Sequence, residues 1–473
     1  MAAHFLLSLA YAASSGGVVI SGAGPAGLLA AHAILSCRPD ARVTVFDRRP
    51  DPRTASSVGA RAYSLGINVR GRTALQHFGL WEAVAQRGVL SSKFFLHFGS
   101  RALQLRANQP GSVPTLLISR DALAAALLDE LQARHAPERL QLRLGTAIQN
   151  VDLRLHQCTT AFGEVIGYTD LIGADGVNSA VRGAMHEQAD GFAASVCDLP
   201  GRYKVFVQPC PPGLDPLAVH AMGAKGYSLF SIPKRGNELC TLLAWRDDEP
   251  FAGRADHEIA AAIATDVPKY GAPTLAALAQ LRAQQPSKAT TVRCSRYHDP
   301  RGRALLLGDA AHSTGGTLGQ GANSALLDVL ALDALLRRGA PAGESVVEAV
   351  GEAFSAAQQP EGLALWQLLQ LPPRGPLRLP YTVAQAARGL AASLTRALPQ
   401  PLRVRPPVQA LLSESTTPFA QIVALNRAWV DAALRGAPAE RHGSGSILPF
   451  ASPQPNGPPA AAAAAPTGTR KTG

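Results

Sequence analysis

The sequence predicts an α/β fold, in which strands alternate with helices and glycine-rich loops join them. The β-branched run "VVIS" at residues 18–21 leads through such a loop into an apolar helical segment, and a second strand-like run, "RVTVF", follows at residues 42–46. Much later, "ALLLGDAAHSTGGTLGQGANSALLD" at residues 304–328 has the same order of strand, loop and helix. Such alternation is typical of a parallel sheet with helices on its faces.

Length and composition predict a globular protein of two or three domains. The 473 residues are 47% apolar and carry a formal charge of +11. The basic residues are scattered, with no Lys/Arg block of five or more, so we predict no nucleic-acid partner. Six cysteines without a CxxC pair or metal-like spacing favour a reducing compartment and predict no metal site. An intracellular location, cytoplasmic or organellar, is expected.

Neither end of the chain shows a clear targeting signal or membrane span. Residues 1–37 contain no Asp, Glu, Lys or Arg. Glycines divide this stretch into apolar pieces that are too short to cross a bilayer. We treat residues 1–15 as an uninterpreted extension. The Pro/Gly/Ala-rich stretch from about residue 440 to the end has no periodicity and is expected to be disordered.

The first glycine-rich loop has the pattern of a dinucleotide-binding turn. It reads GAGPAG at residues 22–27, and Asp47 ends the next strand. In such a turn Gly22 permits the bend, Gly24 lets a pyrophosphate approach the backbone, and Gly27 brings helix and strand together. An acidic residue at the position of Asp47 binds a ribose hydroxyl. Alone, the loop does not separate FAD from a nicotinamide cofactor.

Two later motifs make the pattern more specific. "YTDLIGADGVNSAVRG" at residues 168–183 contains Asp175-Gly176, and Gly308-Asp309 follows further along. These three motifs, in this order, resemble the single-component (class A) FAD-dependent aromatic hydroxylases of the para-hydroxybenzoate hydroxylase fold, over about residues 17–345. Within that family, "GARAYSLGINVRGRTALQHFGL" at residues 59–80 is most similar to the kynurenine 3-monooxygenase-like branch.

The resemblance implies a domain organisation. We expect an FAD-binding Rossmann-like domain of the GR2 type, an inserted β-rich substrate domain and a C-terminal helical region. The expected boundaries are an N-terminal extension at 1–15, a discontinuous FAD-binding domain at 16–76, 115–185 and 290–345, a substrate domain at 77–114 and 186–289, a helical region at 346–437, and a disordered tail at 438–473.

The resemblance also implies which residues hold FAD. Asp309 would accept hydrogen bonds from the ribityl hydroxyls, and the helix that begins near Gln320 would point its free amides at the pyrimidine edge of the flavin. Asp175 would support FAD and transient NADPH contact together with Arg182, whereas His312 is expected to serve the structure of the loop. The expected cofactor-binding residues are Gly22, Gly24, Pro25, Ala26, Gly27, Asp47, Arg48, Arg61, Arg120, Asp175, Gly308, Asp309, Gly319, Gln320, Gly321, Ala322 and Asn323.

The substrate side is less defined by the sequence. No catalytic side chain is predicted; Gly315 and Gly316 are expected to face the flavin as a bare loop. His97, Tyr227 and Phe230, on strand-like segments, are candidates for lining the substrate pocket.

The chain departs from its relatives at two places. Many members have proline where this chain has Gly316, so we expect a more mobile carbonyl, less efficient hydroxylation, and improvement by Gly316→Pro if the local φ permits it. The arginine and tyrosine that clamp kynurenine have no convincing counterpart, since Phe94 and Phe95 stand near the expected arginine.

The implied activity is that of an FAD-dependent monooxygenase, which uses NAD(P)H and O2 to hydroxylate a small aromatic substrate through a C4a-hydroperoxyflavin. Two alternatives stay open: a flavin reductase of the same fold acting on a prenyl or other unsaturated substrate, and a non-catalytic FAD-binding protein. The preference for NADH or NADPH is open too. The basic, amphipathic stretch "VAQAARGLAASLTRAL" at residues 383–398 would permit peripheral membrane contact.

Overall fold

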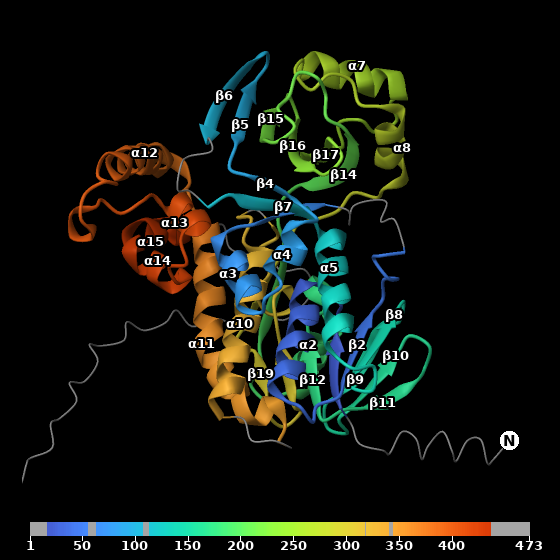
Figure 1. Ribbon diagram of the computed structural model, residues 1–473. Coiled ribbons are helices and arrows are strands. Elements are labelled where there is room, and N and C mark those ends of the chain that lie inside the picture. The colour runs from blue at the N-terminus through green and yellow to red at the C-terminus, as the bar shows by residue number, and fades with distance from the viewer. Residues whose placement is uncertain (1–16, 55–62, 107–112, 317, 340–343, 437–473) are drawn as a thin grey trace, which may run out of the picture.

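A six-stranded sheet forms the centre of the computed structural model, which describes residues 17–54, 63–106, 113–316, 318–339 and 344–436 (Figure 1). Its strand order is β19, β20, β12, β1, β2, β8, all parallel except β19. The predicted α/β fold is confirmed. The strands span His298–Asp299 (β19), Ala304–Leu306 (β20), Asp170–Gly173 (β12), Val18–Ser21 (β1), Val43–Asp47 (β2) and Leu140–Leu144 (β8).

Helices cover this sheet because packing against it removes their apolar side chains from water. α2 has proline at its first position and is almost entirely buried, so it packs as a core helix between the sheet, α5 and α10. Ser119 caps α5 by accepting a hydrogen bond from the Ala122 amide. The helices are α2 (Pro25–Cys37), α3 (Val69–His77), α4 (Trp81–Ala85), α5 (Arg120–Arg134), α6 (Ala180–Gln188), α9 (Asp309–His312), α10 (Gly321–Gly339) and α11 (Val346–Leu369).

A second six-stranded sheet lies above the first (Figure 1), in the order β14, β17, β16, β15, β5, β6. Its outer face packs against α7 (Asp256–Asp266) and α8 (Leu275–Ala283) through a separate apolar core. Its inner face is turned toward β3 (Ser64–Ile67) and β7 (Thr115–Ser119), which pack against β16. The strands are Arg202–Pro209 (β14), Glu238–Trp245 (β17), Tyr227–Lys234 (β16), Val219–Gly223 (β15), Phe94–Phe98 (β5) and Arg101–Arg106 (β6).

Three small sheets complete the β structure. β7 lies between β3 and β4, β10 lies between β9 and β11, and β13 pairs with β18. Their remaining bounds are Val89–Ser91 (β4), Ile148–Asp152 (β9), Gln157–Thr160 (β10), Val165–Gly167 (β11), Ala194–Asp198 (β13) and Thr290–Cys294 (β18). The exact domain boundaries given above stay a prediction, and residues 1–15 and 438–473 lie outside the described residues.

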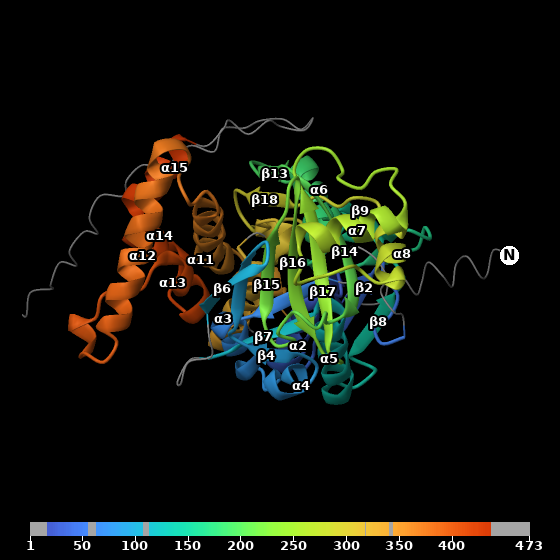
Figure 2. The ribbon, with the colours of Figure 1, turned by 90° about the horizontal axis from the view of Figure 1, so that it is seen from above.

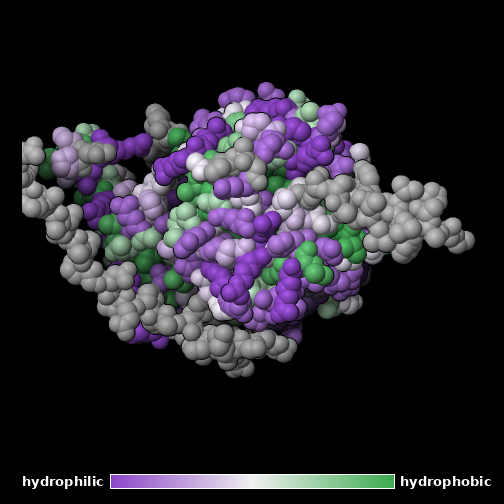
Figure 3. All heavy atoms as spheres, turned by 90° about the horizontal axis from the view of Figure 1, so that it is seen from below, coloured by the Kyte–Doolittle hydropathy of each residue, from purple (hydrophilic) through white to green (hydrophobic). Residues whose placement is uncertain are grey.

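Three C-terminal helices, α13 (Val408–Glu414), α14 (Phe419–Leu425) and α15 (Arg427–Arg435), pack beside α11 around a third apolar core. The fourth, α12 (Arg378–Leu394), contributes no residue to that core. Figure 2 shows α12 standing off to one side of the body, and none of its residues is buried. Across the described part of the chain, no helix has the length and apolarity needed to cross a bilayer. Seen from below, the described surface of the body is mostly hydrophilic (Figure 3).

Candidate cofactor site

Three loops meet at one edge of the central sheet. β1, β12 and β20 are neighbouring parallel strands, so their carboxyl ends point the same way. The Ala174 amide donates to the Ser21 carbonyl at 2.8 Å, and the Leu307 amide donates to the Gly173 carbonyl at 2.9 Å. These bonds hold together the loops that begin with Gly22, Ala174 and Gly308, which are the three predicted motifs.

The glycines of the first loop serve different purposes. Gly22 has a φ of +109°, and a Cβ there would collide with the Ala174 carbonyl oxygen. A Cβ at Gly27 would collide with the Gly22 carbonyl oxygen, so both glycines are required by the chain's own packing. A Cβ at Gly24 would instead have only Arg120 Nη2 nearby, at 3.7 Å. The backbone at Gly24 is therefore open toward a cationic side chain, as a bound diphosphate requires.

Asp47 lies at the end of β2 with its carboxylate fixed. Its Oδ2 accepts hydrogen bonds from the Ala23 amide at 2.9 Å and from Arg49 Nη2 at 2.8 Å. Burial acts to raise the pKa of Asp47, but the bonds and charge of Arg49 outweigh it and hold that pKa below its ordinary value. Arg48, predicted to bind the cofactor, is exposed. The residue that forms an ion pair with Asp47 is Arg49, which was not singled out from the sequence.

Asp309 and Arg120 come together with the first loop. Asp309 begins α9, and its Oδ1 would lie 3.5 Å from a Cβ at Gly321, the first residue of α10. Burial raises the pKa of Asp309, whereas the positive charges of Arg120 and His312 act against that rise. The site thus places a carboxylate, a guanidinium and the open backbone of Gly24 near one another. This donor set fits a dinucleotide with hydroxyl and phosphate groups.

Asp175 supports the second loop from within. Its Oδ2 accepts from the Ala180 amide at 2.8 Å at the start of α6, and burial raises its pKa. Its Oδ1 is buried without a hydrogen-bond partner among the described residues. Arg182 was expected beside this carboxylate as a bridge to phosphates. Its guanidinium instead donates to backbone carbonyls, at 2.6 Å to Val177 and 3.0 Å to Ala310, and so ties the second loop to the third.

The side chains at the start of α10 bind the protein itself. Gln320 Oε1 accepts from Asn68 Nδ2 at 3.2 Å, and Asn323 Oδ1 accepts from the Asn68 amide at 3.0 Å. Asn323 Nδ2 also donates to the carbonyls of Gly66 and Gly319. These bonds fix the N-terminus of α10, including Gly321 and Ala322, against the connection from β3 to α3. Because both ends of the Asn323 side-chain amide are bonded to the protein, a contact of Asn323 with a cofactor is left to its backbone.

His312 belongs to the support of the third loop. Its Nε2 lies 2.7 Å from Asp328 Oδ2, which also accepts from the Gly308 amide at 2.8 Å. Both side chains are buried. The arrangement fits the structural role expected of His312. Asp328, which links the loop to α10, was not singled out from the sequence, because nothing in its local pattern distinguishes it from a surface acid of an amphipathic helix.

The loop that contains Gly315 and Gly316 has a backbone conformation that does not permit the expected substitution Gly316→Pro. Gly316 has a φ of +79°, and proline requires a φ near −65°, so Gly316→Pro cannot restore a rigid carbonyl there. The glycine is a requirement of the backbone conformation. Gly315 also has a positive φ, and a Cβ on it would press on Leu199 at 2.9 Å, whereas a Cβ on Gly316 would meet nothing within 4 Å. Arg61 lies outside the described residues.

The three substrate-pocket candidates do not share a face. Tyr227 is buried on the outer face of the second sheet, where its hydroxyl donates to Asp266 at 3.0 Å. His97 is buried on that same face and its Nε2 lies 2.9 Å from His220 Nδ1. Phe230 lies on the inner face, half-buried, 6.2 Å from the ring of Phe94. Only Phe230 is therefore turned toward the cofactor half of the molecule.

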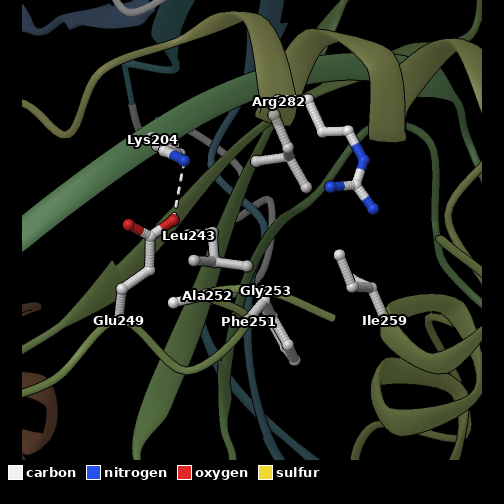
Figure 4. Close-up of a pocket in the computed structure, with 9 residues that line it drawn as sticks. Lys204, Leu243, Glu249, Phe251, Ala252, Gly253, Ile259 and Arg282 are labelled. Atoms are coloured by element: carbon white, nitrogen blue, oxygen red, sulfur yellow. Dashed lines mark hydrogen bonds and ion pairs between the residues drawn. The ribbon is translucent and has the colours of Figure 1, made fainter. Parts of the chain in front are cut away.

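A pocket of about 200 Å³ lies on the outer face of the second sheet (Figure 4). Lys204 and Glu249 form an ion pair of 2.7 Å at its wall, and Leu243 and Ile259 contribute apolar surface. Because Leu243 points away from the inner face, this pocket is separated from the three loops by the sheet. It is not part of the candidate site.

The fold and the site together define a nucleotide-binding flavoprotein with a β-sheet above the cofactor region. The family described as "FAD binding domain" matches residues 16–340. The chain belongs to this family. It is 32% identical over 374 residues to the kynurenine 3-monooxygenase of Xanthomonas euvesicatoria pv. vesicatoria (strain 85-10), with 74% of this chain and 77% of the relative covered. For that of Stenotrophomonas maltophilia (strain K279a) the identity is 30% over 369 residues, with the same coverage.

Solved structures share the fold. The tetrameric form of 2-methyl-3-hydroxypyridine-5-carboxylic acid oxygenase gives a TM-score of 0.58 at 19% identity, covering 79% of this chain and 96% of that one. The tetracycline destructase Tet(51) gives 0.54 at 15% identity, covering 75% and 90%. The predicted membership of the class A FAD-dependent hydroxylases, nearest the kynurenine 3-monooxygenase-like branch, is confirmed, and the chain is an FAD-dependent monooxygenase.

The first prediction concerns Asp309. Asp309→Ala removes the carboxylate beside Gly24 and Arg120, and we expect FAD to bind more weakly by about 1–3 kcal/mol, the scale for losing hydrogen bonds to a charged group. Titration of apoprotein with FAD, followed by flavin fluorescence, measures the change. Asp190→Ala removes an exposed carboxylate and should leave the affinity unchanged. Equal affinities for wild type and Asp309→Ala would remove Asp309 from the site.

The second prediction concerns the His312–Asp328 pair. Burial opposes protonation of His312, but the negative charge and hydrogen bond of Asp328 prevail and raise the pKa of His312 above its ordinary value. A raised pKa stabilises the folded state fully below the unfolded pKa of about 6.5, and this contribution is lost as pH rises through the folded pKa.

We therefore expect Asp328→Asn to reduce the free energy of unfolding most at mildly acidic pH, and progressively less as pH rises above about 6.5. Denaturant unfolding of the FAD-loaded proteins over this range tests the prediction. Asp190→Asn, the same substitution at an exposed site, is the control. A difference between wild type and Asp328→Asn that does not vary with pH would contradict the assignment.

Proposed function

We propose that this protein uses NAD(P)H and O2 to hydroxylate a small aromatic substrate. In the balanced reaction one oxygen atom replaces a ring hydrogen as hydroxyl and the other becomes water, while NAD(P)H supplies two electrons and a proton is consumed. Bound FAD would supply the two-electron chemistry between NAD(P)H and O2. The observation that carries the proposal is the meeting of Gly24, Arg120 and Asp309 beneath a sheet whose inner face is only half-buried.

The chain's own residues would position the reacting groups. Arg120 would neutralise the phosphates of FAD at the open backbone of Gly24. Asp309 would accept hydrogen bonds from hydroxyl groups of the cofactor. The N-terminus of α10, held by Gln320 and Asn323, would direct its partial positive charge toward the cofactor ring and favour its reduced, anionic form. The second sheet would exclude water from the reacting face.

Two other activities would use the same cofactor site. A flavin reductase acting on a prenyl or other unsaturated substrate would oxidise NAD(P)H without placing oxygen in the product. A non-catalytic FAD-binding protein would not oxidise NAD(P)H at all. The relationship to monooxygenases favours hydroxylation over both, and one assay separates the three.

The third prediction is that purified, FAD-loaded protein oxidises NADPH or NADH with matching oxygen uptake when a suitable phenol or aromatic amine is added. Oxygen electrode traces and mass spectrometry of the product, run together across a panel of ring compounds, measure both. Product heavier by one oxygen atom supports hydroxylation. Oxidation of NAD(P)H that reduces a double bond without oxygen uptake would replace the proposal with the reductase activity.

A finer part of the proposal is peripheral contact of α12 with an anionic membrane surface. Residues 371–413 contain six arginines and no acidic residue. On α12 the apolar side chains of Leu379, Val383, Leu390 and Leu394 are between 58% and 75% exposed, at helical spacing. A basic helix with an exposed apolar stripe is suited to the interface of an anionic bilayer.

The fourth prediction is that vesicles containing phosphatidylglycerol co-sediment the protein and that vesicles of phosphatidylcholine alone do not. Leu390→Asp with Leu394→Asp should abolish co-sedimentation, because charge on the apolar stripe opposes its burial in lipid. Leu275→Asp, at a side chain 78% exposed on α8, is the matched control. Failure of the wild type to bind anionic vesicles would refute membrane contact.

A further inference from the structure

A continuous row of apolar side chains crosses the second sheet. Cross-strand pairing joins Leu103 to Leu96, Leu96 to Ala221, Ala221 to Phe230, Phe230 to Leu242, and Leu242 to Val205. Directly paired residues point to the same face of a sheet, so all six side chains line one face. We call this set the apolar row: Leu103, Leu96, Ala221, Phe230, Leu242 and Val205.

The apolar row lies on the inner face. Cys240, two residues before Leu242 on β17, lies beside Ser64 of β3, in the cofactor half of the molecule. Tyr203, two residues before Val205, is close enough to Arg120 for the guanidinium to act on its pKa, which burial raises. The row therefore faces the three loops of the cofactor site.

The row is also left partly uncovered by the protein. Its central members Leu96, Ala221, Phe230 and Leu242 are half-buried. The outer-face neighbours Met222, Leu229 and Leu243 are at most 2% exposed. Alternate residues of the same strands thus differ in burial, because α7 and α8 cover the outer face only. At the edge strand β6, Leu103 is 54% exposed, so the row extends from the interior to solvent.

Charged side chains of the inner face lie at its margins: Arg101 and Arg106 on the edge strand β6, and Lys234 and Glu238 at strand ends. Arg106, opposite Phe94 at the edge, forms an ion pair of 2.6 Å with Glu414. Lys234, at the end of β16, forms one of 3.5 Å with Glu238. None of the six members of the row offers a hydrogen-bonding or charged side chain. A substrate group that carries charge would lose water against this wall and gain no counter-charge from it.

We propose that the substrate is an uncharged, apolar, electron-rich ring compound, a phenol or aromatic amine with alkyl or aryl substituents, and that the apolar row selects it. This inference rests on the proposed hydroxylation. It separates the chain from relatives named for kynurenine, an amino acid with an ammonium and a carboxylate group. Leu96, Ala221, Phe230 and Leu242 form the wall that contacts the ring, and Leu103 marks the edge from which it enters.

The fifth prediction compares ligands that share one ring. 4-Ethylphenol, tyramine and 3-(4-hydroxyphenyl)propionate have neutral, cationic and anionic side chains, respectively. Binding to FAD-loaded protein, followed by the change in flavin absorbance, should favour 4-ethylphenol by about tenfold or more over either charged compound. Kynurenine should bind no better than the charged pair. Equal or tighter binding of a charged compound would overturn the inference.

Two variants test whether the apolar row is responsible. Leu242→Arg places a cation within the row, and we expect it to reverse the preference, with tighter binding of 3-(4-hydroxyphenyl)propionate and weaker binding of 4-ethylphenol. Leu275→Arg makes the same change at an exposed position of α8 and should keep the wild-type preference. FAD content checks that each variant is folded. An unchanged preference in FAD-loaded Leu242→Arg would show that another surface selects the substrate.

Turnover separates this inference from the proposed function. If 4-ethylphenol binds best and none of the compounds supports oxygen uptake, hydroxylation is refuted while the binding preference stands. If a charged compound is the one hydroxylated, the proposed function holds and the inference fails.

Discussion

The parallel pairing of β1 with β12 and of β12 with β20 is the constraint on which the candidate site depends. It places the ends of three strands, separated by more than a hundred residues along the chain, within hydrogen-bonding distance of one another at Ser21, Gly173 and Leu307. This pairing brings the Ala174 carbonyl so close that a Cβ at Gly22 would collide with it, and a Cβ at Gly27 would collide with the Gly22 carbonyl of the same turn. Arg182 and Asp328 then secure the loops to each other and to α10. The polar groups that remain directed into the site are those not used by this scaffold, chiefly Arg120 and Asp309.

The motifs of the cofactor half could be predicted from sequence because they are local. A tight turn, a close helix and an acidic strand end each need a particular residue at a particular spacing, and "GAGPAG" with Asp47 shows all of them. Their supporting partners could not be predicted. Asn68 and Asp328 act across more than 250 and about 20 residues of sequence, through contacts that only the folded chain creates. The ion pair of Asp47 with Arg49 likewise depends on the local direction of the backbone after β2.

Two of the three substrate-pocket candidates, Tyr227 and His97, lie on the outer face of the second sheet, and for Tyr227 the sequence contained the reason. Tyr227 and Phe230 are three residues apart on one strand, and side chains alternate between faces with a period of two. They could not both line one pocket on β16. His97 required knowledge of the pairing of β5 with β15, which is parallel and joins segments more than a hundred residues apart. The φ of Gly316 could not be predicted from the sequence either. A glycine permits unusual backbone conformations, but the residue type does not show which conformation the chain adopts.

The two halves of the site constrain their ligands by opposite physical means. In the cofactor half, a charged diphosphate can be accommodated because Arg120 and open backbone amides replace the water it loses. On the inner face of the second sheet no such replacement exists along the apolar row, so a ligand there gains free energy only by withdrawing apolar surface from water. In this chain strand register fixes which six positions form the apolar row, so a change of side chain there would leave the three loops of the cofactor half as they are. Phe230 and Leu242 illustrate this separation: they contribute little to the outer-face core that holds α7 and α8, so their identity is available to set the polarity of the substrate.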